Sequence, residues 1–501
     1  MQTESNWWER QWVSVALALA CAVPLLWPAL PPLSDLPGHM ARWHIATALA
    51  GSADLQRYYD YHWALIPNLG MDLLVPALAA ILGLEPATKV AVIAIPVMTA
   101  GGLLWMAREV HGRVPPTALF ALPLVYAWPF QFGFVNFALS QGLAFCAFAL
   151  WVRLGRQERF AVRAAVFVPI ACVLWIAHSF GWGMFGLMAG GAELARLRAR
   201  GSSWGAAVLG AGAQCASLTV PIVFMLGGGG AALGADDWFN IPVKILWVTA
   251  MLRDRWQWFD LLSLVPLLGI LYVGARSRAL GFAPMLGWPA MLCLAAFVAL
   301  PRLLMGGAYV DMRMAPAAVM LAIVAIAPAR GELRFGRTLA AVGLAVLIVR
   351  LLGGTVSFAE RSAEQQRELA AVESIPRGAA VLSLIARPCP DAWSDLRRDQ
   401  LGSIAVVRRD AFVNGQWALP GQQLLRIRHT QAAPYLVDPS QQVLPARCAD
   451  IGSNFAVAIA RFPRAAFDYV WTIGFPPGAA RASDLRLAWT DGRSALYRVA
   501  R

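Results

Sequence analysis

A series of long apolar segments fills most of the first 356 residues of this chain. A helix needs about 20 residues to cross a bilayer, and nearly all of these segments approach that length. Hydrophobic residues make up 58% of the chain, charged residues only 14%, and the mean hydropathy is +0.56, which excludes a water-soluble enzyme. We therefore predict a polytopic, all-α membrane domain with apolar segments at roughly 11–30, 66–84, 89–107, 115–131, 135–152, 163–178, 179–195, 204–226, 258–275, 283–300, 314–328 and 336–356.

Basic residues cluster between these segments and predict the orientation, because short loops rich in Arg and Lys stay in the cytoplasm. If every segment crosses the membrane, the Arg153–Arg163 loop falls on the wrong side. If 66–84 is a re-entrant or juxtamembrane element, every cluster is cytoplasmic, which predicts eleven spans with the N-terminus inside and the C-terminal domain outside. The clusters contain Arg10, Arg108, Arg113, Arg153, Arg156, Arg159, Arg163, Arg196, Arg198, Arg200, Arg276, Arg278, Arg330, Arg334 and Arg337.

Residues 357–501 have a different composition, rich in Arg, Asp, Gln and Pro with short alternating runs. This predicts a soluble α/β domain outside the membrane, large enough for its own core. We expect a helix at 358–374, strands at 379–386 and 403–407, and a closing hairpin built from 467–471 and 485–499. The membrane domain would then cover 1–356, with an outer loop at 31–65.

The seven cysteines divide into two groups. Five lie in apolar segments, where small core residues are expected: Cys21, Cys146, Cys172, Cys215 and Cys293. Cys389 and Cys448 lie in the C-terminal domain, where an oxidising compartment would allow a disulfide, although spacing alone does not establish one. The formal net charge of +13 fits loop anchoring or contact with anionic lipid, and no basic-aromatic motif for nucleic acid is present.

Asp35 follows the first apolar segment in Asp35-Leu-Pro-Gly-His39, and an ionisable group held at a membrane boundary suggests a functional site. Capping of a helix N-terminus is the alternative interpretation, since Pro37 follows two residues later. His39 lies one turn further on, where it would contact a phosphate or a metal, or merely orient the loop. Asp72 is the second candidate for an essential acid.

The order of a first span, an outer loop opening with Asp35, a many-span core and an exported α/β tail resembles the GT-C superfamily of membrane glycosyltransferases. Within it, the protein-mannosyltransferase and aminoarabinose-transferase type is most similar. Local similarities occur at 136–142, 177–181 and 311–316. The resemblance implies sugar transfer from a polyprenyl-phosphate carrier on the outer side of the bacterial inner membrane, with Asp35 as the essential acid. It leaves open the sugar, whether hexose or pentose, and the acceptor, whether lipid, glycan or protein.

Such chemistry needs a carboxylate to accept the proton of the acceptor hydroxyl and cationic donors for the leaving phosphate. Asp35 is our candidate base for an inverting transfer, and no cofactor is indicated, with a divalent cation left open. The candidate substrate-binding residues on the predicted outer side are His39, Arg42, Gln131, Asn136, His178, Asp236, Asp237, Lys244, Arg302, Asp311 and Arg313. No His, Cys, Asp or Glu set has the spacing of metal ligands.

Each of these candidates also has a structural interpretation. Gln131 and Asn136 could bind sugar hydroxyls or satisfy backbone groups at a helix junction. Asp236 and Asp237 follow a glycine run that could close over substrate or be an ordinary solvated loop. Asp311 and Arg313 could form an ion pair or flank a span. At the level of the whole protein, a lipid-linked glycan flippase and a non-catalytic envelope assembly protein remain alternatives, and Arg350 inside the last span is the main residue that favours transport.

Overall fold

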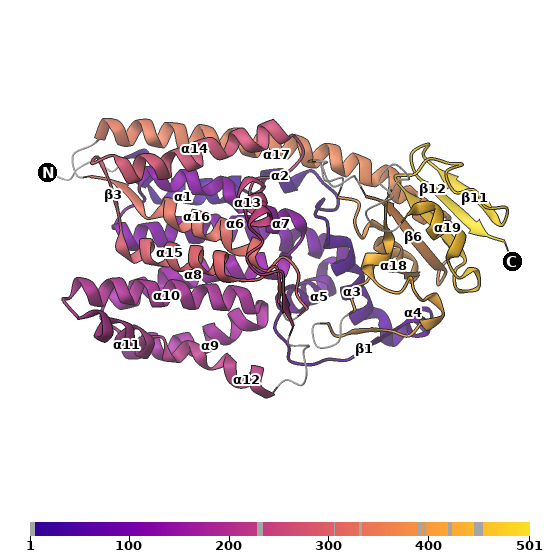
Figure 1. The fold of residues 1–501 in the computed structure, drawn as a ribbon, viewed down its shortest axis with the longest axis horizontal. Helices are drawn as coiled ribbons and strands as arrows, with labels where there is room; N and C mark the ends of the chain where they lie inside the picture. The colour runs from indigo at the N-terminus through magenta and orange to yellow at the C-terminus, as the bar shows by residue number, and fades with distance from the viewer. Residues whose placement is uncertain are drawn as a thin grey trace.

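The structure is a computed structural model that describes residues 6–227, 234–304, 306–329, 333–387, 393, 397–418, 423–444 and 454–500. Helices lie side by side in a long bundle, and a β-sheet lies at one end of it (Figure 1). The helix α1 (Gln11–Ala20), near the start of the described chain, lies in the part of the bundle away from the sheet (Figure 1). The division of the chain into two domains at 356–357 stays a prediction.

Five helices of the described chain are long and apolar enough to cross a membrane, or six if the bent pair Trp204–Gln214 and Ala216–Leu226 forms one span. The chain is therefore a multi-pass membrane protein, while the number of eleven spans stays a prediction. The five are α6 (Leu84–His111), α8 (Val135–Arg156), α9 (Phe160–Ala177), α14 (Gln257–Arg276) and α17 (Leu333–Leu369). Other predicted segments contain α1 (Gln11–Ala20), α2 (Val23–Leu26), α5 (Gly70–Leu82), α10 (Ser179–Ala199), α15 (Pro284–Ala299) and α16 (Met314–Val324).

Two predicted segments differ from a regular spanning helix. In place of an α-helix over 115–131, the chain forms the buried 3₁₀ helix η3 (Pro116–Tyr126) and the short α7 (Trp128–Phe132). This segment contains four prolines, none of which can donate the backbone hydrogen bond that an α-helix requires: Pro115, Pro116, Pro123 and Pro129. The helix α5 has 13 residues, fewer than the roughly 20 that a straight span needs.

Basic residues at the ends of α6 and α8 gather beside the N-terminal segment. Arg108 donates to the Glu9 carbonyl at 2.7 Å, and Arg113 pairs with the Glu9 carboxylate at 3.4 Å. Arg156, in the last turn of α8, pairs with Glu109 at 2.7 Å. The N-terminal segment and the basic ends of α6 and α8, which the sequence analysis places on the same side of the membrane, thus lie at one end of the bundle.

The C-terminal region forms a six-stranded mixed sheet in the order β11-β12-β10-β6-β7, with β9 also pairing with β6. The central strands β10 (Tyr469–Ile473) and β6 (Ala380–Ala386) are parallel, whereas β11 (Leu485–Thr490) and β12 (Ala495–Val499) form an antiparallel hairpin. The short strands β7 (Phe412–Val413) and β9 (Gln442–Val443) pair with opposite ends of β6. The predicted first strand and the closing hairpin are therefore present.

The predicted strand at 403–407 is wrong, because this segment forms α18 (Ile404–Arg409) after a 3₁₀ turn at Leu401–Ser403. A short apolar run has no periodicity that separates a strand from a buried helix. Its residues 404–406 are fully buried, and α18 packs against α3 (Leu36–Ala48) and β7. Cys389 and Cys448 lie outside the described residues, whereas the five cysteines of the apolar segments are free thiols.

The first loop is joined to the C-terminal region rather than separate from it. Its strand β1 (Tyr59–Tyr61) pairs antiparallel with β8 (Leu425–Ile427). The helix α17 runs without a break from the bundle toward the sheet, through position 356 (Figure 1). Two segments that are more than 350 residues apart in the sequence therefore build one body at this end of the molecule.

Candidate functional site

Asp35 precedes the first turn of α3 and is held there by the chain between α7 and α8. Its backbone N–H donates to the Phe132 carbonyl at 3.0 Å, and that of Ser34 donates to Gln131 at 3.4 Å. Gly133 adopts a left-handed φ of +100°, and a Cβ placed there would lie 2.7 Å from the Asp35 nitrogen. Only glycine permits this approach, so the position of Asp35 depends on a residue almost 100 positions away.

The Asp35 side chain is not used as a helix cap, since it accepts no cap hydrogen bond from the first turn of α3. Instead, its Oδ1 lies 3.4 Å from Nε2 of Gln400, which belongs to the C-terminal region. The carboxylate is half-buried. These contacts favour a role for the side chain other than capping alone.

Arg42, one turn beyond His39 on α3, is buried against Asp72 of α5. Its Nε and Nη2 donate to the two carboxylate oxygens at 2.7 and 3.1 Å, and Nη2 also lies 2.9 Å from Nδ1 of His39. Asn136 donates to Asp72 at 3.0 Å and accepts the Met71 N–H at 2.5 Å. Asn136 therefore satisfies buried groups of α5, and Asp72 is the counter-ion of Arg42.

The charges of this group are set by burial and by one another. Burial, followed by the charge of Arg42, lowers the pKa of His39 to about 3, so the ring is neutral. Burial opposes the charge of Arg42, but Asp72, together with the more distant Tyr61 and Asp35, raises the pKa of Arg42. Neutral His39 accepts from Arg42 through Nδ1 while its other nitrogen bonds the Gly133 carbonyl.

Arg313 and His178 form a second buried group beside Asp35. Nη1 of Arg313 lies 3.1 Å from Nε2 of His178, whose Nδ1 already accepts the Phe180 N–H at 3.1 Å. A neutral imidazole has only one acceptor nitrogen, so this ring cannot satisfy both donors at once.

Arg313 carries a charge that no carboxylate of the described chain contacts within ion-pair distance. Its guanidinium packs over Phe134 at 4.4 Å, Nη2 donates to the Ala308 carbonyl at 3.2 Å, and buried Nε has no hydrogen-bond partner among the described residues. Burial lowers the pKa of Arg313 to about 10, against the stabilising charge of Asp35. Asp35 thus acts electrostatically on two buried guanidinium groups, those of Arg42 and Arg313.

Other predicted site residues connect neighbouring segments. Lys244 pairs with Asp311 at 3.1 Å, and Trp247 donates to the other oxygen of the same carboxylate at 3.2 Å. Arg302 pairs with Asp237 at 3.2 Å, and Asp236 lies exposed on strand β2 (Ala235–Asp236). The Lys244 charge is therefore neutralised within the fold, in contrast to that of Arg313.

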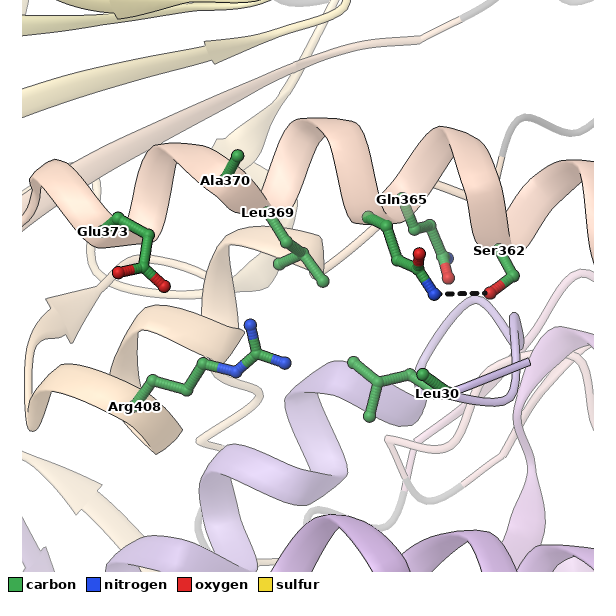
Figure 2. A pocket seen from close by; sticks show the side chains of 9 residues that line it. Leu30, Ser362, Gln365, Leu369, Ala370, Glu373 and Arg408 are labelled. Carbon is green, nitrogen blue, oxygen red and sulfur yellow. Dashed lines mark hydrogen bonds between the residues drawn. The ribbon is translucent and has the colours of Figure 1, made fainter. Parts of the chain in front are cut away.

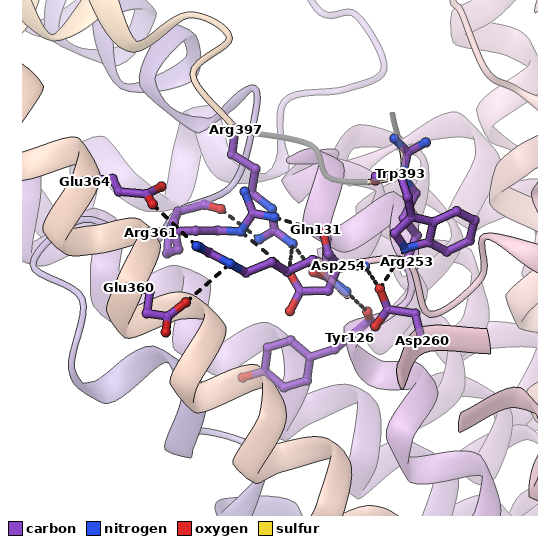
Figure 3. Close-up of polar contacts among 12 residues, drawn as sticks. Tyr126, Gln131, Arg253, Asp254, Asp260, Glu360, Arg361, Glu364, Trp393 and Arg397 are labelled. Carbon is purple, nitrogen blue, oxygen red and sulfur yellow. Dashed lines mark hydrogen bonds and ion pairs between the residues drawn. The ribbon is translucent and has the colours of Figure 1, made fainter. Parts of the chain in front are cut away.

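Gln131 belongs to a buried polar network between the bundle and the C-terminal region (Figure 3). Its Nε2 donates to the Tyr126 carbonyl at 2.7 Å, and its Oε1 accepts from Arg397. Arg397 also pairs with Asp254 at 2.7 Å and donates to the Pro32 carbonyl at 2.8 Å. Both ends of the Gln131 amide are thus engaged by the protein.

Sequence reasoning missed three contributors to this region. Gln400 contacts Asp35, Gly133 leaves space for the Asp35 backbone, and the buried Tyr61 hydroxyl near the Arg42 pair has no hydrogen-bond partner in the part of the chain that the structure describes. Because the φ of +100° at position 133 requires a glycine, the residue type itself was a signal in the sequence. No local sequence feature links Gln400 or Tyr61 to Asp35. Within the described residues, no group of three or more His, Cys, Asp or Glu is arranged to hold a metal ion.

A separate pocket of about 230 Å³ lies where α17 passes the chain that follows α2 (Figure 2). Leu30 and Leu369 supply apolar walls, and Arg408, held by Glu85 at 2.8 Å, lies at one side. The described lining contains none of the predicted site residues. This pocket is therefore distinct from the surroundings of Asp35.

No family model matches the chain, and no curated protein matches it by sequence. Among solved structures, it is similar to ArnT from Cupriavidus metallidurans bound to undecaprenyl phosphate, with 12% identity, coverage of 97% of both chains and a TM-score of 0.47. It is also similar to the apo state of that protein, with 13% identity, the same coverage and a TM-score of 0.48. At these values, neither similarity transfers an activity to this chain.

Proposed function

We propose that this protein is an integral membrane glycosyltransferase that transfers a sugar from a polyprenyl-phosphate carrier to an envelope acceptor. The observation that carries the proposal is the half-buried carboxylate of Asp35, which acts on the buried guanidinium of Arg313, a charge that has no carboxylate partner in the described chain. A base beside an unneutralised cation suits a reaction in which a hydroxyl loses a proton and a phosphate gains charge.

In the proposed reaction, Asp35 accepts the proton of the acceptor hydroxyl as its oxygen bonds to the anomeric carbon. The bond from that carbon to the carrier phosphate breaks on the opposite face, so the configuration inverts. Arg313 stabilises the negative charge on the departing phosphate, and its unpartnered Nε is a donor available to a phosphate oxygen. Arg42 is occupied by Asp72 and orients the loop.

We further propose the membrane arrangement that the basic segments predict. The end of the bundle with Glu9 and Arg113 is cytoplasmic, and the Asp35 site, the 31–65 loop and residues 357–501 face the periplasm. The polyprenyl chain would lie in the outer leaflet. Undecaprenyl phosphate, the lipid bound to the solved ArnT structure, is the first carrier to test.

The transport alternative is weakened by the environment of Arg350. Its Nη1 pairs with Asp260 at 2.9 Å, and its Nη2 donates to the Leu252 carbonyl at 3.0 Å. The charge of Arg350 therefore links α17 to α14 and to the chain that precedes α14. A buried charge in a helix bundle requires such partners.

The test is transfer from a panel of radiolabelled undecaprenyl-phosphate sugars in membranes that contain equal amounts of each variant. Asp35→Asn should abolish transfer, because the amide cannot accept the proton. The matched control is Asp54→Asn, an acid of the same loop whose exposed pair with Arg57 lies at 3.2 Å. Unchanged turnover in correctly inserted Asp35→Asn would exclude the proposed base.

A further inference from the structure

A short segment of the C-terminal region, residues 397–403, reaches the loop that carries Asp35. At its start, Arg397 is buried and donates to the Pro32 carbonyl at 2.8 Å, three residues before Asp35. Gln400 follows with a left-handed φ of +60°, and its backbone carbonyl accepts the Ser403 N–H at 2.8 Å. This turn directs a buried side chain, only 8% exposed, toward α3.

The Gln400 amide lies over the first turn of α3. Its Nε2 donates to Oδ1 of Asp35 at 3.4 Å. A Cβ added to Gly38 would lie 1.4 Å from Oε1 of Gln400, so only a glycine in this helix leaves space for the amide. Glycine lowers the stability of a helix relative to alanine, and this contact is a physical reason for a glycine at position 38.

We propose that Gln400 is a positioning residue for Asp35, so that the C-terminal region completes the site rather than merely adjoining it. This inference rests on the proposed function, in which Asp35 must be ionised and aimed at a hydroxyl. An amide donor stabilises the ionised carboxylate and restricts its rotamer. Within the described residues, Arg42 of α3 and Arg313 of the bundle act on the same carboxylate, and the titratable rings of His39 and His178 contact these two guanidinium groups.

The first readout does not require turnover. A carbodiimide reacts with a protonated carboxyl group, so the pH dependence of Asp35 labelling, followed by peptide mass spectrometry, reports its ionisation. Gln400→Ala should move the midpoint of labelling upward by about one pH unit, the order expected for a lost hydrogen bond to a charge. Gln400→Glu should move it further, since a second carboxylate would face the first.

Gly38→Ala provides a second perturbation that keeps the glutamine. Its methyl group displaces the amide, so this variant should reproduce the shifted midpoint of Gln400→Ala while its helix propensity improves. The double variant should behave like Gln400→Ala alone, because no amide is left to displace. The matched control is Gln416→Ala, which loses a buried hydrogen bond to Ser403 at 3.3 Å but should leave the Asp35 midpoint unchanged.

Turnover is then measured against pH with the same variants. The acid limb of the profile should shift upward by about one pH unit in Gln400→Ala, with roughly fivefold lower transfer at the original midpoint and roughly tenfold lower transfer well below it. Labelling midpoints that are the same in wild type, Gln400→Ala and Gln400→Glu would overturn the inference. If the midpoints shift but Asp35→Asn keeps full activity, the contact between Gln400 and Asp35 is supported and the proposed function is rejected.

Discussion

The guanidinium of Arg42 contacts both carboxylate oxygens of Asp72, with distances of 2.7 Å from Nε to Oδ1 and 3.1 Å from Nη2 to Oδ2. The two side chains are only 5% and 3% exposed. Because Arg42 belongs to α3 and Asp72 to α5, the pair joins the loop that carries Asp35 to the helix bundle. A substitution that removes one partner leaves the other charge buried and uncompensated.

Asp72→Asn should therefore lower the free energy of unfolding by about 3–5 kcal/mol, the usual cost of breaking a buried ion pair. Thermal and denaturant unfolding in detergent, followed by tryptophan fluorescence, would measure it. Glu158→Gln is the control, because its pair with Arg200 is 68% and 52% exposed and should contribute at most about 1 kcal/mol. Equal stability of the two variants would contradict the structural importance of the buried pair.

Gly133→Ala should displace Asp35, since the added methyl group would meet the Asp35 backbone at 2.7 Å and a backbone cannot swing aside. Misplacement of a reacting group by about 1 Å can reduce turnover about 10²-fold, which is the loss expected in the transfer assay. Gly112→Ala is the matched control, with a similar left-handed φ of +73° but nothing within 4 Å. It should lose about 1–2 kcal/mol of stability and keep its turnover per folded molecule.

His39 should make stability sensitive to acid. The pKa of the ring is about 3 in the folded protein against 6.5 in the unfolded chain, with burial as the main cause. Below pH 6.5 the His39 ring of the unfolded chain becomes protonated, whereas the ring of the folded protein stays neutral down to about pH 3. The free energy of unfolding therefore decreases as the pH falls from 6.5 to about 3.

The variant His39→Gln retains a donor and an acceptor but does not titrate, so its melting temperature should fall less between pH 6.5 and pH 4. His62→Gln, at a histidine that is 54% exposed, should follow the wild-type curve. Parallel curves for wild type and His39→Gln would show that the ring does not resist protonation.

Arg313→Ala should reduce kcat by about 10²–10³-fold if its guanidinium stabilises the leaving phosphate. Arg313→Lys should recover part of this loss, because the charge returns without the planar set of donors. Arg302→Ala should have a smaller effect, since Arg302 is paired with Asp237 at 3.2 Å. Equal kcat values for the two alanine variants, with only KM altered, would assign Arg313 to ground-state binding instead.

Much of the helix bundle could be predicted because its signal is local. The segments that became α6 and α8 are long enough and apolar enough to span a bilayer whatever lies beside them. Local information failed for the segment 403–407, where a run of apolar residues fits a strand and a buried helix equally well, and packing against α3 selected the helix. At η3 the internal Pro123 is visible in the sequence, but length and hydropathy alone favour an α-helix.

The sequence by itself determined the membrane class, the break in composition after the last apolar segment, and an acid at the start of the first loop, since each depends on residue type over a short stretch. Only the tertiary structure decided that Arg42 is neutralised by Asp72, that no carboxylate of the described residues pairs with Arg313, and that Gln400 reaches Asp35. Charge pairing and side-chain contact depend on which distant residues share a space, and 365 positions separate that last pair. No periodicity or local motif encodes such a separation.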